Sequence, residues 1–219
     1  MAFSGRMIAY NAVFRDTALK AKHHLDIGCD RGDITCAVWK LLGKPETLGV
    51  DTNDTAIADA QEKYGVFQDE GLTFSKVNEI PEVSTYDVIT ALEVLEHVNE
   101  KEYFLSFVSS KMSSNSSLIL SVPHKGLFDF LDPFNFRFLL PQKVFRFLYR
   151  LVKRSSPNFD DRPAHHHFTV HELSDILKTA DLKIISYRRY GFFFFYVKWL
   201  YSDILDRNFN GNSLHSISF

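Results

Sequence analysis

Short hydrophobic runs alternate with amphipathic stretches along the first 125 residues of the chain. The runs predict buried strands, which cover residues 24–28, 47–50, 72–77, 86–92 and 118–122. Helical spacing of apolar positions predicts helices around and between them, which cover residues 7–20, 33–42, 54–64 (capped by Asn53 or Asp54) and 100–112. Because this alternation is typical of parallel βαβ units, right-handed crossovers predict a doubly wound α/β sheet with helices on both faces.

The alternation stops after Pro123 and resumes near Val170. Residues 124–164 are rich in Phe, Pro and basic side chains and predict no further βαβ unit. A helix over residues 170–180 and a strand over 182–190 follow, and residues 192–197 favour another strand. We therefore expect one domain over residues 1–219, with a Phe-rich insertion or lid at about 124–164.

Composition narrows the class of protein. A chain of 219 residues with 45% hydrophobic residues can bury a substantial single core. The formal net charge of −2 argues against a nucleic-acid partner held by bulk charge. Cys29 and Cys36 lie in one early segment, which argues against a disulfide framework and favours a cytoplasmic location. The first 20 residues interleave charged and apolar positions, unlike a signal peptide or a membrane span.

Candidate chemistry begins where the first strand ends, in the segment DIGCDRG over residues 26–32. Glycines there permit a tight turn and close backbone approach to a ligand, and the next helix offers free N–H groups at its start. The order Gly28, Asp30, Gly32 does not match the dinucleotide fingerprint, which argues against a nicotinamide oxidoreductase. Asp51 ends the second strand, where a carboxylate can accept both hydroxyls of a ribose; the alternative is that Asp51 caps the next helix.

The segments HLDIGCDRGD, LGVD, YDVITALEVLEHV and LILSVP resemble the successive motifs of class I S-adenosylmethionine-dependent methyltransferases, and HHFTVHELSDILKTADLKI resembles that family's late helix–strand unit. The resemblance implies a Rossmann-like, mostly parallel seven-stranded sheet with an antiparallel late strand, and S-adenosylmethionine as cofactor. It implies that the cofactor contacts Asp26, Gly28, Cys29, Asp30, Gly32, Asp51, Thr52, Asn78, Leu92 and Glu93. Asp30 departs from the family's usual Gly, and a left-handed backbone costs Asp more than Gly.

Glu93, Glu96 and His97 follow the fourth predicted strand. Methyl transfer mainly requires alignment of acceptor and methyl, and a base helps a hydroxyl or amine acceptor, so Glu93 and His97 are the candidate catalytic residues. The E-x-x-E-H pattern resembles ubiquinone-biosynthesis O-methyltransferases and also small-RNA 2′-O-methyltransferases, in which a later His completes a metal site. That alternative leaves Mg²⁺ or Mn²⁺ open, with ligands Glu93, Glu96, His97 and His167, or His165 or His166 in place of His167. Without a metal, Glu93 lines the cofactor edge, Glu96 is solvated or caps a turn, and His97 packs against the motif.

The insertion bears on the substrate. Residues 141–154, if helical, have one apolar and one basic face. A helix of this kind can lie on an anionic membrane surface, although the pattern favours a Phe-rich face that closes over the sheet as a lid or core. Either arrangement predicts an apolar acceptor pocket, and neither apolar segment around it is long enough to span a bilayer.

Taken together, the sequence predicts transfer of a methyl group from S-adenosylmethionine to an oxygen of a small or lipid-like acceptor, with peripheral membrane contact as a minority interpretation. Two alternatives stay open. One is an RNA 2′-O-methyltransferase that uses a divalent metal. The other is a non-catalytic binding module that retains the fold, which Asp30 motivates. The sequence does not set the oligomeric state.

Overall fold

The structure, a computed structural model, describes residues 21–82, 84–125, 166–188 and 216–218, together with Val144 and Phe147. The helix predicted at 7–20, the strand predicted at 192–197 and nearly all of the Phe-rich insertion lie outside the described residues. The described residues include the DIGCDRG segment, the second predicted strand with Asp51, and the E-x-x-E-H segment.

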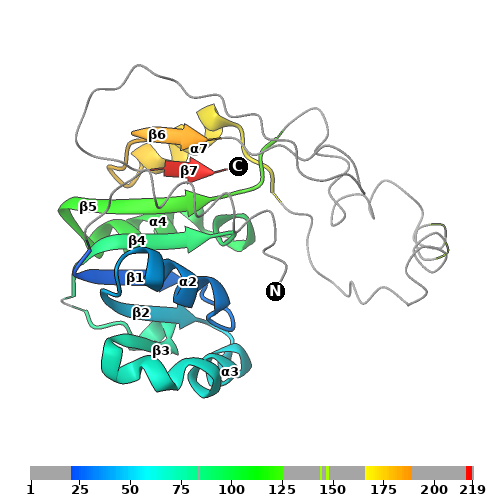
Figure 1. The fold of residues 1–219 in the computed structure, drawn as a ribbon. Helices are drawn as coiled ribbons and strands as arrows, with labels where there is room; N and C mark the ends of the chain where they lie inside the picture. The colour runs from blue at the N-terminus through cyan, green and yellow to red at the C-terminus, as the bar shows by residue number, and fades with distance from the viewer. Residues whose placement is uncertain are drawn as a thin grey trace.

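Five parallel strands form the central sheet (Figure 1). They are β1 (His23–Ile27), β2 (Glu46–Asp51), β3 (Leu72–Lys76), β4 (Tyr86–Leu92) and β5 (Met112–Ser121), in the spatial order β3-β2-β1-β4-β5. The chain winds outward from β1 to β3 and then returns to β4 on the other side of β1. This reversal is the point at which open α/β sheets bind ligands, beyond the carboxyl ends of the strands. The predicted Rossmann-like parallel sheet is confirmed.

Two three-residue strands continue the sheet past β5, in the order β5-β7-β6. They are β6 (Ser186–Arg188) and β7 (Ser216–Ser218), and β7 pairs in parallel with both of its neighbours. The expectation of an antiparallel late strand is therefore wrong for the described residues. The chain that would extend this edge lies in ranges the structure does not describe, so a complete seven-stranded family sheet stays a prediction.

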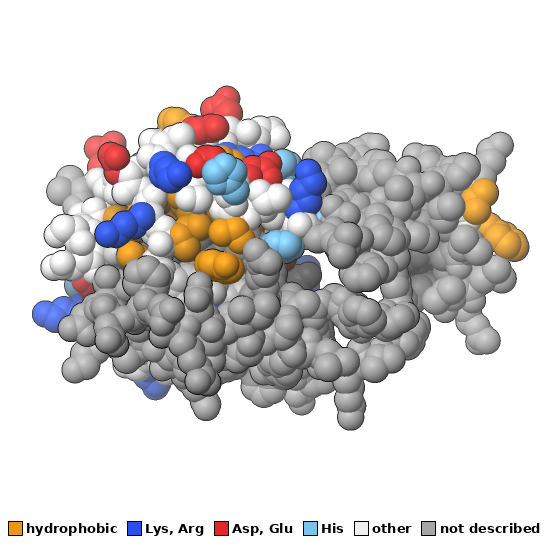
Figure 2. All heavy atoms as spheres, turned by 90° about the horizontal axis from the view of Figure 1, so that it is seen from above, with side chains coloured by type: hydrophobic (Ala, Val, Ile, Leu, Met, Phe, Trp, Pro, Cys, Tyr) orange, Lys and Arg blue, Asp and Glu red, His pale blue; other side chains and the backbone are white. Residues whose placement is uncertain are grey.

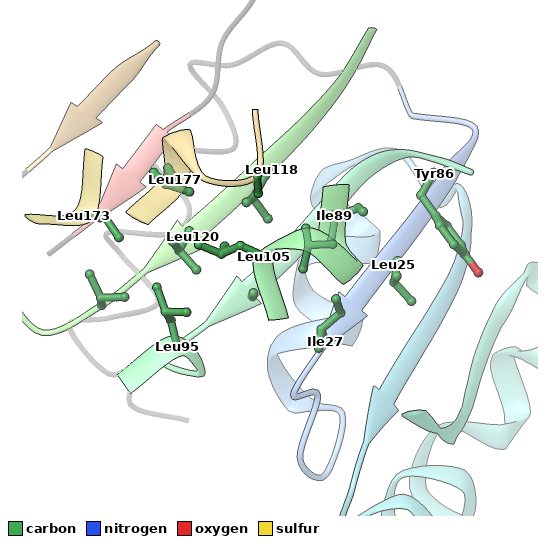
Figure 3. Close-up of a cluster of buried hydrophobic side chains, with 14 of the residues drawn as sticks. Leu25, Ile27, Tyr86, Ile89, Leu95, Leu105, Leu118, Leu120, Leu173 and Leu177 are labelled. Atoms are coloured by element: carbon green, nitrogen blue, oxygen red, sulfur yellow. The ribbon is translucent and has the colours of Figure 1, made fainter. Parts of the chain in front are cut away.

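Helices cover both faces of the sheet, as the sequence predicts. Helices α4 (Lys101–Ser110) and α7 (Val170–Lys178) pack on one face over a large apolar cluster. The side chains that fill this cluster include Leu25, Ile27, Ile89, Leu105, Leu118, Leu120, Leu173 and Leu177 (Figure 3). On the opposite face, α2 (Asp33–Leu41) packs on β4 and β5, and α2 and α3 (Asp54–Tyr64) together cover β3.

Local sequence explains where the helices begin. Asn53 caps α3, because its side-chain oxygen accepts hydrogen bonds from the backbone N–H groups of Thr55 (3.0 Å) and Ala56 (3.3 Å). Thr169 caps α7 in a capping box with Glu172, in which each side chain accepts from the other residue's backbone N–H. Asn53 is one of the two caps that the sequence predicts for α3, and Asp51 is not the cap of that helix.

Two boundaries differ from the prediction. The strand predicted from residue 182 begins only at Ser186, as β6. Strand β5 begins at Met112, whereas the sequence pattern predicts a helix to residue 112 and a strand only from 118. The serine-rich start of the strand is polar, which hides it from a hydrophobicity pattern. Its backbone extends beside β4, and Ser116 Oγ donates to the Tyr86 carbonyl over 2.6 Å, which satisfies a buried hydroxyl.

Lys111 closes the amino end of this β4–β5 pair. Its side chain is buried, and Nζ donates to the carbonyl oxygens of Pro81 (2.7 Å) and Glu82 (2.9 Å).

Figure 2 views the molecule from the β6–β7 edge, where charged and His side chains surround a group of hydrophobic ones. A hollow between α4, β5 and α7, lined in part by Met112, Leu118 and Leu182, lies toward this amino end and not at the carboxyl edge.

Two observations bear on membrane contact. Within the described part of the chain, no helix combines the length and the apolar composition that a membrane crossing needs. Val144 and Phe147, two apolar residues of the predicted helix 141–154, have helical backbone and are exposed. The remainder of that helix lies outside the described residues, so its role as a lid or a membrane contact stays a prediction.

Candidate functional site

The loop between β1 and α2 is built from left-handed backbone. Gly28 (φ 78°), Asp30 (φ 46°) and Gly32 (φ 77°) all have positive φ, and the amides of Gly28 and Cys29 both donate to the Val50 carbonyl on β2 (2.8 and 3.0 Å). Gly32 is the N-cap of α2 and has no side chain, so no capping group competes for the first N–H groups of the helix. Open N–H groups at a helix start suit a ligand with acceptor atoms.

Two side chains fill the space that the loop glycines leave. A Cβ on Gly28 would lie closer than 3.0 Å to Val94 Cγ2, in the turn after β4. A Cβ on Gly32 would lie 2.8 Å from the Phe74 ring, and a Cβ on Gly49 of β2 would lie 2.7 Å from the same ring. The loop is thus pressed between β4's turn on one side and β3's aromatic ring on the other, and only glycine fits at these contacts.

Asp51 is held in one orientation at the end of β2. Its Oδ2 accepts from the Asp30 amide over 2.9 Å, and its Oδ1 accepts from the Asn53 amide over 2.9 Å. Each carboxylate oxygen keeps a further lone pair for a ligand. Asp30 therefore contributes its backbone N–H to this carboxylate from a left-handed conformation that Asp tolerates better than most residues.

Asp26 lies beneath the same loop and is 3% exposed. Thr35 Oγ1 donates to its Oδ2 and Thr90 Oγ1 donates to its Oδ1, both over 2.5 Å. Burial raises the pKa of this carboxyl to about 6, while the two hydroxyls act against the shift and the nearby Asp51 charge adds to it. Asp26 is therefore a buried carboxyl that two threonine hydroxyls hold beneath the loop.

His24 continues this polar chain inward. Its side chain is fully buried, and Nε2 lies 2.9 Å from Thr90 Oγ1 while Nδ1 lies 3.3 Å from Thr47 Oγ1. Burial lowers the pKa of the imidazole to about 3, so the ring is neutral at physiological pH. The sequence pattern did not single out His24, Thr35, Thr47 or Thr90.

Glu93 begins a strained turn directly after β4. Its φ is 59°, which is unfavourable for a non-glycine residue. The turn is fastened to β5 because the Glu93 amide donates to the Ser121 carbonyl (3.1 Å) and hydroxyl (3.0 Å), and Ser121 Oγ donates back to Glu93 Oε1 over 2.9 Å. Strain that neighbouring contacts enforce in this way is typical of functional sites.

The structure does not bring the proposed metal ligands together. Among the residues that it describes, no group of three or more His, Cys, Asp and Glu side chains could hold a metal ion. Glu96 is buried and His97 is exposed in the single 3-10 turn Leu95–His97. His167 lies next to Phe168, whose backbone forms hydrogen bonds with the backbone of Pro123 and Lys125 beyond the end of β5. The metal set that the sequence left open is therefore not supported, and His165 lies outside the described residues.

The remaining predicted cofactor residues sit around the same edge. Thr52 is exposed beside Asp51, Leu92 is buried at the end of β4, and Cys29 is buried within the loop, where burial raises the pKa of its thiol. Asn78 is exposed in the 3-10 turn Val77–Glu79 after β3. Because Asp51 pairs with Lys76 in the sheet, Asn78 lies only two residues beyond the strand position next to Asp51.

A parallel sheet with a glycine turn at its reversal point and an oriented carboxylate at the next strand end is typical of Rossmann-like folds that bind a nucleoside-containing cofactor. The comparisons with known proteins agree. The family model described as a methyltransferase domain matches residues 6–187. The chain belongs to this family of methyltransferase domains.

Among curated proteins, the chain is 29% identical over 113 residues to the ubiquinone biosynthesis O-methyltransferase of Rhodopseudomonas palustris strain BisB5. The matched segment covers 50% of this chain and 43% of that protein. It is 32% identical over 129 residues to the mitochondrial ubiquinone biosynthesis O-methyltransferase of Schizosaccharomyces pombe. This matched segment covers 57% of this chain and 46% of that protein. The chain thus spans less than half the length of these relatives.

Solved structures share the fold. The AdoHcy complex of PKMT2 from Rickettsia typhi matches with a TM-score of 0.62 and 14% identity, over 80% of this chain and 43% of that chain. The magnesium protoporphyrin IX methyltransferase of Synechocystis PCC 6803, with bound SAH, matches with a TM-score of 0.53 and 17% identity, over 81% of this chain and 75% of that chain.

Proposed function

We propose that this protein transfers the methyl group of S-adenosylmethionine to an oxygen atom of a small or lipid-like acceptor. The observation that carries the proposal is Asp51. Backbone amides on two sides of this carboxylate fix its orientation, and it faces the glycine loop at the reversal point of the sheet. This is the arrangement that accepts two ribose hydroxyls.

The residues present fit an adenosyl cofactor. The start of α2 offers backbone N–H groups that no side chain caps, and Val94 and Phe74 fill the space that a Cβ at Gly28 or Gly32 would need. Asp51 would hold the ribose, Asn78 and Thr52 would border the adenine, and the buried Asp26 charge would favour the cationic methionine end. When bound, the cofactor supplies an electrophilic methyl group on a sulfonium.

Glu93 and His97 are the residues that we assign to the acceptor. Glu93 is fixed at the carboxyl end of β4 by Ser121, so its carboxylate is held in place before a ligand arrives. His97 is exposed four residues later and can accept a proton from an acceptor hydroxyl. The O-methyltransferase names of the curated relatives support oxygen as the methylated atom.

Calorimetric titration with S-adenosylmethionine and S-adenosylhomocysteine tests the cofactor assignment. Asp51→Asn removes the charge and one acceptor oxygen, so we expect it to weaken S-adenosylhomocysteine binding by about ten- to a hundredfold. Asp175→Asn makes the same change on α7, on the other face of the sheet, and should bind as the wild type does. Equal affinity of all three proteins would refute the role of Asp51.

Methyl transfer is then measured with hydroxylated aromatic, hydroxylated lipid, amine and short RNA acceptors, with and without Mg²⁺ or Mn²⁺. Turnover of a hydroxylated small molecule without added metal supports the proposal. Metal-dependent methylation of RNA would replace it with the 2′-O-methyltransferase alternative. Tight cofactor binding without turnover of any acceptor would favour the binding module.

A further inference from the structure

Buried polar side chains beneath the loop between β1 and α2 form a chain of hydrogen bonds, in which His24 and Thr90 each donate a proton toward Asp26. It joins Thr47, His24, Thr90 and Asp26, which lie on β2, β1 and β4 and share the sheet face that α2 covers. Strand register makes the chain: His24 is paired with Thr47, and Asp26 is paired with Thr90. A buried histidine with no part in the proposed methyl transfer therefore contacts the cofactor site through a single threonine.

Proton counting sets the direction. Thr90 has one hydroxyl proton, and the 2.5 Å contact with Asp26 Oδ1 uses it. The oxygen of Thr90 must then accept from His24 Nε2, 2.9 Å away, so Nε2 carries the imidazole proton. Nδ1 lies 3.3 Å from Thr47 Oγ1, whose own proton is directed to the Pro45 carbonyl 3.2 Å away. The lowered pKa of His24 makes the ring neutral, so Nδ1 is left without a proton.

We propose that Thr90 and His24 are positioning residues that hold the Asp26 carboxylate ionised and oriented beneath the Gly28 loop, and that they thereby set how cofactor affinity depends on pH. The link to affinity rests on the proposed function, whereas the hydrogen-bond chain itself does not. Thr90 acts directly on Asp26 Oδ1, and His24 acts through Thr90 by occupying the lone pair of its hydroxyl. Thr35 holds the other carboxylate oxygen from α2.

Other charged groups face Asp26 from the neighbouring elements. The Asp51 charge on β2 disfavours ionisation of Asp26, and burial raises the pKa of the Cys29 thiol, with the Asp26, Asp51 and Asp30 charges adding to that shift. His24 stays neutral because its pKa is about 3. Asp26, with its pKa raised to about 6, is the buried group at this site that changes charge near neutral pH.

The first measurement needs no cofactor. Carbon-13 NMR follows the Asp26 side-chain carboxyl against pH in the apo protein, and nitrogen-15 NMR reads the His24 tautomer. We expect a protonated Nε2 and an unprotonated Nδ1. We also expect Thr90→Val to raise the Asp26 midpoint by about one pH unit or more, since it deletes a hydrogen bond to the ionised form. Thr90→Ser should restore the wild-type midpoint, and Thr35→Val should raise it without touching His24.

The second measurement is the affinity for S-adenosylhomocysteine across the same pH range. Affinity should fall as pH drops through the Asp26 midpoint of each variant, because the α-ammonium group of S-adenosylhomocysteine loses a buried counter-charge. Thr73→Val, which removes a hydroxyl that donates to the Thr47 carbonyl, is the matched control and should follow the wild type.

Three results decide the matter. An unchanged Asp26 midpoint in Thr90→Val, or a His24 ring protonated at Nδ1, overturns the hydrogen-bond chain. A shifted midpoint that the affinity profile does not follow overturns the link to cofactor binding. If the wild type binds S-adenosylhomocysteine at no pH, the proposed function fails, while the NMR midpoints still decide whether Thr90 and His24 position Asp26.

Discussion

Gly28→Ala is expected to destabilise the fold through two separable effects. The first is backbone strain, since Gly28 has φ +78° and a residue with a Cβ costs about 1–2 kcal/mol in the left-handed region. The second is a collision, because the new Cβ would lie closer than 3.0 Å to Val94 Cγ2. Gly43 is a matched control: its φ is +82°, and nothing lies within 4 Å of the place that a Cβ would take there.

The two glycines therefore separate strain from overpacking. Val94 is β-branched and has little freedom to rotate away, so the collision at Gly28 must be relieved by shifts that cost about 1–3 kcal/mol. Adding the strain gives a loss of about 2–5 kcal/mol of unfolding free energy for Gly28→Ala, against about 1–2 kcal/mol for Gly43→Ala.

Urea unfolding followed by tryptophan fluorescence measures both losses, with the buried Trp39 as the main probe. Val94→Ala opens the space beside Gly28, so the double variant Gly28→Ala/Val94→Ala should recover the overpacking part in a double-mutant cycle. Equal losses for Gly28→Ala and Gly43→Ala would refute the collision. So would an absence of coupling between positions 28 and 94.

Three further outcomes are expected. Lys111→Met removes the two hydrogen bonds that the buried Lys111 side chain donates to the Pro81 and Glu82 carbonyls and should lower the unfolding free energy by about 1–3 kcal/mol; an unchanged denaturation midpoint would contradict this. Thr169→Ala removes the cap of α7 and should cost about 0.5–2 kcal/mol, while Thr169→Ser should cost little in the same thermal melts. Burial raises the Asp26 pKa from 3.8 to about 6, so the stability this group contributes is full below 3.8 and is lost as pH rises through 6. Asp26→Asn should therefore gain about 1 kcal/mol relative to the wild type between about pH 5 and pH 8; a gain that is the same at both pH values would contradict the buried charge.

Much of the fold could be predicted because its strands are short apolar runs between polar turns. Strands β1 to β4 lie within one or two residues of their predicted positions. The start of β5 was missed because residues 113–117 are almost all serine, and their strand conformation depends on partners such as the Tyr86 carbonyl, which a local pattern does not contain. The orientation of β7 depends on long-range pairing in the same way.

Some positions of the candidate site could also be predicted from the sequence, and others could not. Gly28 and Asp51 could be predicted from the motif, because the backbone geometry at each position restricts the residue type. Thr90 could not, since its role follows from register with Asp26 across strands 64 residues apart. The alternation of side chains along a strand offered one signal, because it puts His24 and Asp26 on the same face.

Among the described residues, the proposed metal ligands do not come together, for a local reason. The E-x-x-E-H letters suggest side chains that converge, but residues 95–97 form a 3-10 turn. The Glu96 side chain enters the interior and the His97 side chain faces solvent, so neighbours in sequence are separated in space. A pattern of letters does not fix such directions, whereas the backbone does.

The Phe74 ring, which lies against both Gly32 and Gly49, has a consequence for how this sequence can diverge. A methyl group at either glycine would enter the space of one ring, at 2.8 Å and 2.7 Å. Replacement of Phe74 by a smaller residue would remove the closest contact at both positions, although Tyr64 and Cys29 would still lie 3.1 and 3.2 Å from a Cβ at positions 32 and 49, and the left-handed φ would still restrict position 32. Positions 32, 49 and 74 should therefore covary as a triplet among descendants of this chain, with the aromatic ring retained wherever both glycines are kept.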